Sequence, residues 1–113
     1  MESRNIQIFT KIISRAKEAI SDTENMDYNT FLEDDKTIRA VVFSISQIGE
    51  LVKALDENIL NKYNNINWIE IRGLRNRIIH DYEGIQFRVI WEVIVEDLPR
   101  LIKDIKEIIN KEK

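Results

Sequence analysis

The stretch NWIEIRGLRNRIIHDYEGI, from Asn67 to Ile85, holds both a helix start and a dense group of polar side chains. Asn67 can cap a helix, and Glu70, three residues later, completes a capping-box pattern. The apolar residues at helical spacing form the side that meets the core: Ile71, Leu74 and Ile78. The sequence therefore predicts a helix that begins after Asn67 and stops at Gly84.

The polar side of this predicted helix carries the candidate site. Asn76 and His80 lie opposite the apolar stripe, whereas Arg75 lies at its margin, where we expect it to be partly buried and paired. Arg75 and His80 are about 140° apart on a regular helix, so one small ligand can contact both only if the helix unwinds near His80. The other solution is a site assembled from two copies of the helix by a two-fold axis.

The rest of the chain predicts further helices. Apolar residues at spacings of three and four indicate a helix over residues 4–21 and a second, long helix from about residue 34 to 60, separated by a polar run at residues 21–29. Gly49 lies inside the second helix at a cost of about 1 kcal/mol relative to alanine, which a close helix crossing or a bend can offset. In the last helical segment, Pro99 predicts either a kink or two abutting helices.

Composition favours one all-α domain spanning residues 1–113. With 43% hydrophobic and 33% charged residues, three glycines and one proline, the chain suits an antiparallel bundle of four or five helices. Cysteine is absent, which excludes a disulfide framework and a thiolate zinc site and favours a reducing, cytoplasmic location. No window approaches the roughly 18 apolar residues of a membrane span, so we expect no membrane association.

The net charge of −3 argues against a protein that coats nucleic acid with a broad basic surface. Any RNA contact must then be local. The arginines between Asn67 and Ile85 form the available cluster, with Arg88 beyond it. Arg72 and Arg77 are candidate RNA contacts, although arginines in such positions are more often solvated charges.

His80 is the only histidine, and this limits the chemistry of one chain. Metal-independent RNA cleavage needs a base for the 2′-hydroxyl and an acid for the leaving 5′-oxygen, so a symmetric dimer with two imidazoles is better equipped than a monomer. A metal site with two histidines from one chain is excluded, no phosphate-binding glycine loop is present, and we expect neither metal nor cofactor. Taken alone, a histidine near a helix end more often serves the helix dipole than catalysis.

Three segments together resemble the HepT family of HEPN-superfamily toxins. They are the stretch quoted above, SISQIGELVKAL at residues 44–55 and VIWEVIVEDLPRLI at residues 89–102. The resemblance runs from Asp34 to Ile105. An arginine-to-histidine spacing alone is a weak signal, but between these two flanking segments it becomes specific.

The family motif is an arginine, four residues, a histidine, one residue and a tyrosine, which here are Arg75, His80 and Tyr82. The resemblance implies an all-α HEPN bundle that forms a homodimer with its motifs facing each other. It implies a metal-independent endoribonuclease toxin that cuts tRNA or mRNA, with Arg75 and His80 as the catalytic pair and Asn76 supporting them. The implied partner is a MntA-type minimal nucleotidyltransferase antitoxin, which transfers AMP from ATP to the motif tyrosine, by position Tyr82. AMP there would block RNA sterically and electrostatically.

Two other functions stay open at the level of sequence. One is a non-catalytic helical subunit that docks a nucleotidyltransferase; a stable complex that survives Arg75→Ala, without RNA cleavage, would mark it. The other is a helical dimerisation domain without a ligand, for which a monomer that lacks a cleft is the simplest sign.

Overall fold

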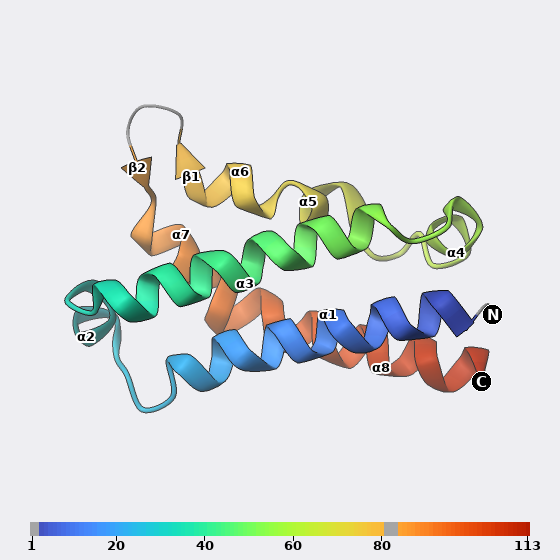
Figure 1. Cartoon of the computed structure of the whole chain (residues 1–113), viewed down its shortest axis with the longest axis horizontal. Coiled ribbons are helices and arrows are strands. Elements are labelled where there is room, and N and C mark those ends of the chain that lie inside the picture. The colour runs from blue at the N-terminus through green and yellow to red at the C-terminus, as the bar shows by residue number, and fades with distance from the viewer. Residues whose placement is uncertain (1–2, 81–83) are drawn as a thin grey trace.

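The computed structural model describes residues 3–80 and 84–113, which are largely helical and form an elongated antiparallel bundle (Figure 1). The helical elements are α1 (Ser3–Asp22), α2 (Tyr28–Leu32), α3 (Asp35–Lys53), α4 (Glu57–Lys62), α5 (Trp68–Arg72), α6 (Leu74–Ile78), α7 (Phe87–Glu92), a π-helical segment η1 (Val93–Asp97) and α8 (Leu98–Glu112). The helical rods α1, α3, α5–α6 and α7–α8 run alternately in opposite directions, and α2 and α4 close the ends. The predicted all-α antiparallel bundle is confirmed.

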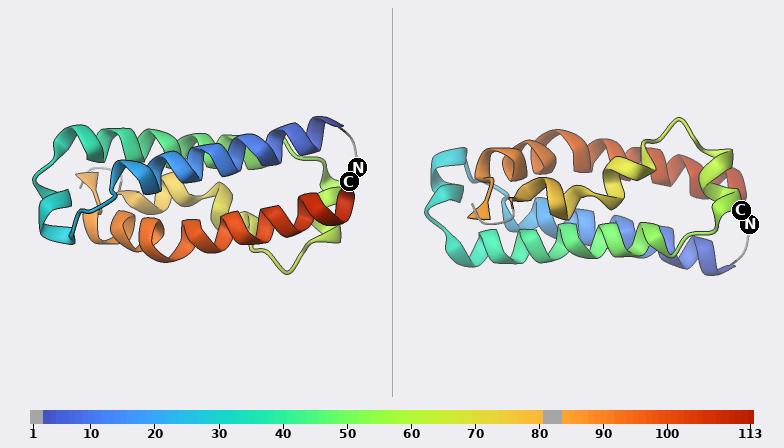
Figure 2. Two further views of the ribbon diagram at one scale, coloured as in Figure 1. Left: turned by 90° about the horizontal axis from the view of Figure 1, so that it is seen from below. Right: turned by 90° about the horizontal axis from the view of Figure 1, so that it is seen from above.

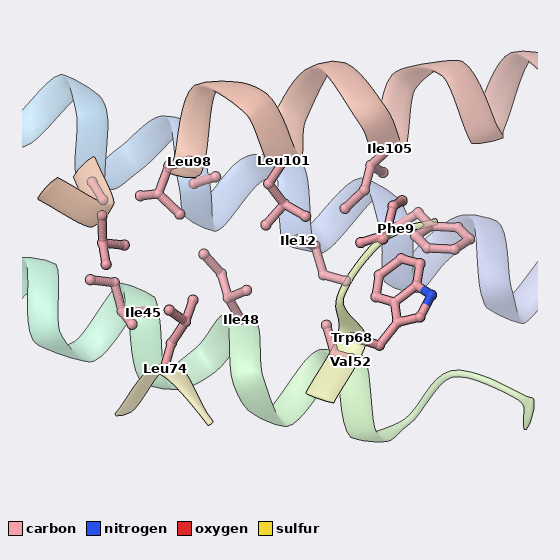
Figure 3. Close-up of a cluster of buried hydrophobic side chains, with 14 of the residues drawn as sticks. Phe9, Ile12, Ile45, Ile48, Val52, Trp68, Leu74, Leu98, Leu101 and Ile105 are labelled. Atoms are coloured by element: carbon pink, nitrogen blue, oxygen red, sulfur yellow. The ribbon is translucent and has the colours of Figure 1, made fainter. Parts of the chain in front are cut away.

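Apolar side chains from all four rods meet in one buried cluster (Figure 3). Its members include Phe9 and Ile12 of α1, Ile45, Ile48 and Val52 of α3, Trp68 and Leu74 of α5–α6, and Leu98, Leu101 and Ile105 of α8. The indole N–H of Trp68 is satisfied inside this cluster, because it donates to the carbonyl of Tyr63 at 3.0 Å. The core therefore fixes the start of the segment that carries the motif.

The predicted first helix is confirmed, but the prediction of one helix from about residue 34 to 60 is wrong beyond Lys53. Helix α3 ends at Ala54, and Asp56 is extended, with φ −69° and ψ 143°. Asn5 of α1 holds this break, because its amide donates to the Asp56 carboxylate at 3.1 Å. Ile59 stays buried in α4, so the apolar spacing continues across a break that it does not reveal.

Helix α2 begins at the end of the polar run and is a second departure from the prediction. The side chain of Asp27 accepts a hydrogen bond from the backbone N–H of Thr30 at 2.8 Å, which caps the short helix. Phe31 then inserts fully into the core. A helix of one and a half turns is too short to show a periodic pattern, and its existence depends on this one buried ring.

The helix predicted from Asn67 starts as expected, with the Asn67 side chain accepting from the N–H of Glu70 at 3.1 Å. It is interrupted at Gly73 and ends at Ile78, so the predicted stop at Gly84 is wrong. The chain then forms a two-residue strand, β1 (Ile79–His80), which pairs antiparallel with β2 (Gly84–Ile85). The helix is therefore unwound near His80, which is one of the two alternatives left open by the sequence.

Pro99 lies where two helical segments abut. It is in the first turn of α8, which begins directly after η1, and there the missing N–H of a proline is tolerated. The π-helical segment ends at Asp97, so the last helical stretch is divided just before the proline. Of the two predicted alternatives, abutting helices are therefore confirmed.

Gly49 sits where α3 crosses α5. A Cβ atom at this position would lie 3.1 Å from the carbonyl oxygen of Arg72 and 3.7 Å from that of Ile71. The predicted close helix crossing is confirmed, and it sets the distance between α3 and the segment that leads into the motif.

Candidate functional site

The motif lies at one end of the bundle. Helix α6 packs against α3 and α7, and β1 continues from it into the hairpin. Figure 2 shows α2, the hairpin and α7 gathered at this end, whereas the two chain ends lie at the other. The elements that carry the candidate residues are therefore brought together by α6 and the strand that follows it.

On one side of α6, Arg77 is tied to two other elements. Its guanidinium pairs with the carboxylate of Asp97 in η1 at 3.2 Å and with that of Glu70 in α5 at 3.3 Å. About a third of the Arg77 side chain and a third of that of Asp97 are exposed. Arg77, predicted as an RNA contact, is thus committed to intramolecular ion pairs. Sequence reasoning missed Asp97, because no local pattern links it to a residue on another helix.

The surface around the ion pairs of Arg77 is unfavourable for a phosphate. A cavity of about 220 Å³ lies between the segment leading into α6 and the start of α8. Glu70, Asp97 and Asp104 line it, and Leu74 and Leu98 contribute apolar walls. The carboxylates of Glu70 and Asp97 are paired with Arg77, and Arg100 also lines the cavity, so its lining offers no clear surplus of positive charge for an anionic ligand.

Arg75 lies on the other side of α6 from Arg77, because two residues along a helix correspond to a rotation of about 200°. The Arg75 side chain is exposed and makes no hydrogen bond or ion pair with any described residue. The prediction that Arg75 is partly buried and paired is therefore wrong. That prediction assumed an unbroken helix beside Trp68, but the turn at Gly73 interrupts the helix. Asn76 is exposed as well.

Arg72 is the last residue of α5, directly before the break at Gly73. It is half-buried beside Ile69, and both line a shallow hollow between α4 and α5. Ile69 is 75% exposed and Phe43 of α3 is 60% exposed, the two highest values for large apolar side chains in the described residues. The folded chain thus leaves one large apolar side chain uncovered on α3 and another on α5.

The backbone of His80 lies in β1, paired with Gly84 of β2. Arg75 and His80 therefore do not lie on one continuous helix. The angle of about 140° that would keep them from a shared ligand on a regular helix does not apply. Tyr82, the expected acceptor of AMP, lies outside the described residues.

Residues 3–80 and 84–113 contain no group of three or more His, Cys, Asp or Glu side chains arranged to hold a metal ion. Within the same ranges, every helix is too short or too polar to cross a membrane.

Comparisons with known proteins point to one family. The profile of the family described as Ribonuclease HepT-like matches residues 6–108. A protein of Methanocaldococcus jannaschii, named as a candidate RNase, is 38% identical over 97% of this chain and 92% of its own length. A candidate RNase of Caldanaerobacter subterraneus is 37% identical over 90% of this chain and 91% of its own length. A Thermococcus cleftensis protein, named as a candidate ribonuclease HepT, is 32% identical, with 87% and 90% covered. No solved structure matches the chain.

Proposed function

Because the chain belongs to the HepT-like ribonuclease family of the HEPN superfamily, we propose that it is an endoribonuclease that cleaves cellular RNA without a metal ion. The observation that carries the proposal is the state of Arg75, an exposed guanidinium with no partner among the described residues. It lies on α6, which continues directly into the strand that holds His80. An arginine left unpaired five residues before the sole histidine of the sequence is equipped to bind a phosphate.

The proposed reaction assigns each motif residue one task. The imidazole of His80 takes the proton from the 2′-hydroxyl, which attacks the adjacent phosphorus and expels the 5′-oxygen. Arg75 stabilises the negative charge that develops on the phosphate oxygens, and Asn76 supports it as a neutral hydrogen-bond donor. Arg72, at the end of α5, contacts the RNA backbone. The products are a 2′,3′-cyclic phosphate and a 5′-hydroxyl.

The proposal includes a homodimer, in which a second imidazole supplies the proton to the leaving oxygen. Phe43 and Ile69 support this arrangement, because exposed large apolar side chains on neighbouring elements are typical of protein interfaces. They lie on α3 and α5, the rods that border Arg75. A two-fold contact through this face brings the two motifs toward each other.

The proposed partner is a MntA-type nucleotidyltransferase antitoxin, which modifies Tyr82 with AMP and so neutralises a toxin. The position of Tyr82, two residues after His80, supports it. The test is the intact mass of the protein after co-expression with a nucleotidyltransferase encoded beside it. We expect a gain equal to one AMP that is lost in Tyr82→Phe, and an unchanged mass would refute the modification.

The nuclease proposal is tested by incubating purified protein with total cellular RNA in excess chelator. We expect cleavage by the wild type, and strong loss in His80→Ala and Arg75→Ala. Arg100→Ala, an exposed arginine of α8, is the charge-matched control and should cleave normally. Intact RNA with every protein, together with a stable nucleotidyltransferase complex, would instead identify a non-catalytic docking subunit.

A further inference from the structure

A second arginine near the motif is held by an aromatic ring. The guanidinium carbon of Arg88, in the first turn of α7, lies 4.0 Å from the centroid of the Tyr28 ring on α2. This distance corresponds to a stacked cation–π contact, in which the planar guanidinium lies against the ring. The two residues are far apart in the sequence and meet only because α2 and α7 pack together at this end (Figure 1).

The ring that supports Arg88 is itself anchored. The centroids of Tyr28 and Trp91 are 6.1 Å apart, and those of Trp91 and Phe31 are 5.2 Å apart. Phe31 is completely buried. Arg88 is thus the outermost member of a series of contacting planar groups that begins in the core, and its position is set before any ligand arrives.

The charge of Arg88 remains uncompensated. The residue is exposed, and in the described ranges it forms neither a hydrogen bond nor an ion pair. Glu92 lies one helical turn further on, at a spacing that permits pairing, yet the two are not paired. Asp27, next to Tyr28, instead caps α2 through Thr30. Stacking occupies one face of the guanidinium and leaves its N–H groups at the edge available.

Arg88 is also close to the motif along the chain. Gly84 pairs with His80 in the hairpin, and Arg88 follows Gly84 by four residues. Four residues of fully extended chain span at most about 14 Å, which bounds the distance between the Cα atoms of Gly84 and Arg88. Phosphates of a single RNA strand near the cleaved bond lie within such a distance.

We infer that Arg88, held by Tyr28, binds a phosphate of single-stranded RNA that flanks the cleaved bond. This inference rests on the ribonuclease function proposed above. Edge N–H groups in one plane can donate two parallel hydrogen bonds to a phosphate, and the tyrosine ring keeps that plane fixed. A lysine can supply the positive charge but not the planar set of N–H donors that a guanidinium has. The contact adds a second cationic point to a chain whose overall charge is negative.

The experiment measures binding of a fluorescein-labelled oligouridylate to the full chain carrying His80→Ala, by fluorescence anisotropy at several salt concentrations. In this background we expect Arg88→Ala to weaken binding about tenfold. It should also reduce the slope of log affinity against log salt by about 0.7, the value for one phosphate of a single strand. Tyr28→Leu should weaken binding although it retains every charge, and Tyr28→Phe should not.

Arg100→Ala removes the same charge from α8 and is the matched control, and it should leave affinity and slope unchanged. Thermal unfolding of each variant checks that the fold is retained, and Arg88→Lys, which keeps the charge but not the plane, should fall between wild type and Arg88→Ala. If the His80→Ala parent binds the RNA and the Arg88 and Tyr28 variants bind equally well, the contact merely joins α2 to α7 and the inference is wrong. If the parent itself does not bind, the proposed function fails as well.

Discussion

Arg77 of α6 and Asp97 of η1 are 20 residues apart in the sequence, and their side chains form an ion pair at 3.2 Å. Asp97 is the last residue of the π-helical segment, so the widened turn helps to set where its carboxylate lies. The pair ties the short motif helix to the C-terminal rod and occupies the arginine on that side. Arg75, on the other side of α6, has no such partner in the described chain.

Asp97→Asn should clearly reduce RNA cleavage, whereas its effect on the free energy of unfolding should be small. The pair is one-third exposed, so its loss should reduce the free energy of unfolding by less than about 1 kcal/mol. The same change removes one of the two carboxylates that hold Arg77, so α6, which carries Arg75, is held less firmly. Urea unfolding and RNA cleavage measured on one preparation provide the comparison. Glu96→Gln, the exposed neighbouring carboxylate, is the control, and equal cleavage by both variants would contradict the positioning role.

Gly49→Ala should destabilise the protein by about 1 kcal/mol, because the cost of overpacking exceeds the gain in helix propensity. The new methyl group would meet the carbonyl oxygen of Arg72 at 3.1 Å, and that atom belongs to backbone rather than to a flexible side chain. Gly73→Ala is the matched control: its φ is −91° and its nearest contacts are at 3.5 Å or more. Urea unfolding should separate the two, and an equal effect would refute the close-crossing explanation.

Phe43→Lys should convert the proposed dimer into a monomer and abolish cleavage. The 60% exposed ring lies on the proposed interface, where two lysines related by a two-fold axis repel and bury no apolar area. Light scattering gives the mass in solution. Val95→Lys, at a 53% exposed position in η1, changes charge and apolarity equally and should leave the mass unaltered. A monomeric wild type would remove the basis of the two-chain site.

Stability should fall in acid through Glu112. The Glu112 carboxylate accepts hydrogen bonds from Lys62, at 2.5 Å, and from the Tyr63 hydroxyl, which close the end of α8 onto α4. The Lys62 bond is the main cause that holds the pKa of Glu112 below its ordinary value of 4.5. A carboxyl whose pKa is lower in the folded state contributes its full stabilisation above its unfolded-state pKa. The contribution is lost as the pH falls through the folded-state pKa.

The urea midpoint of the wild type should therefore fall more steeply than that of Glu112→Gln between about pH 6 and about pH 3. Glu107→Gln, an exposed glutamate on the same helix, should follow the wild type. Parallel curves for the wild type and Glu112→Gln would show that this carboxyl does not couple protonation to folding.

The parts of the fold that the sequence predicts are those set by local patterns. The cap at Asn67, the buried stripe of α6 and the first helix all follow from residue spacing and short-range hydrogen bonding. The break after Lys53 does not follow from residue spacing, because it is held by Asn5 of another helix. Ile59, which comes after the break, stays buried, so the apolar spacing continues across it. Periodicity reports which residues are buried, and it stays silent where a chain turns without exposing them.

The candidate site divides in the same way. The sequence motif identifies Arg75, Asn76 and His80 as candidate residues. It does not show which of the nearby arginines form ion pairs within the chain and which are left unpaired. Arg77 is tied by Asp97, and Arg88 is stacked on Tyr28, and both partners lie on other elements. Such pairings depend on how the rods pack, and one sequence without structure carries no signal for them.

The ends of the RNA fragments produced in excess chelator report directly on the chemistry proposed for His80 and Arg75. Wild-type protein should leave a 2′,3′-cyclic phosphate on one fragment and a 5′-hydroxyl on the other, detected by mass spectrometry, and neither end should appear with His80→Ala or Arg75→Ala. Cleavage that leaves 5′-phosphates, or that persists in both variants, would contradict attack by the 2′-hydroxyl at a centre built from these two residues.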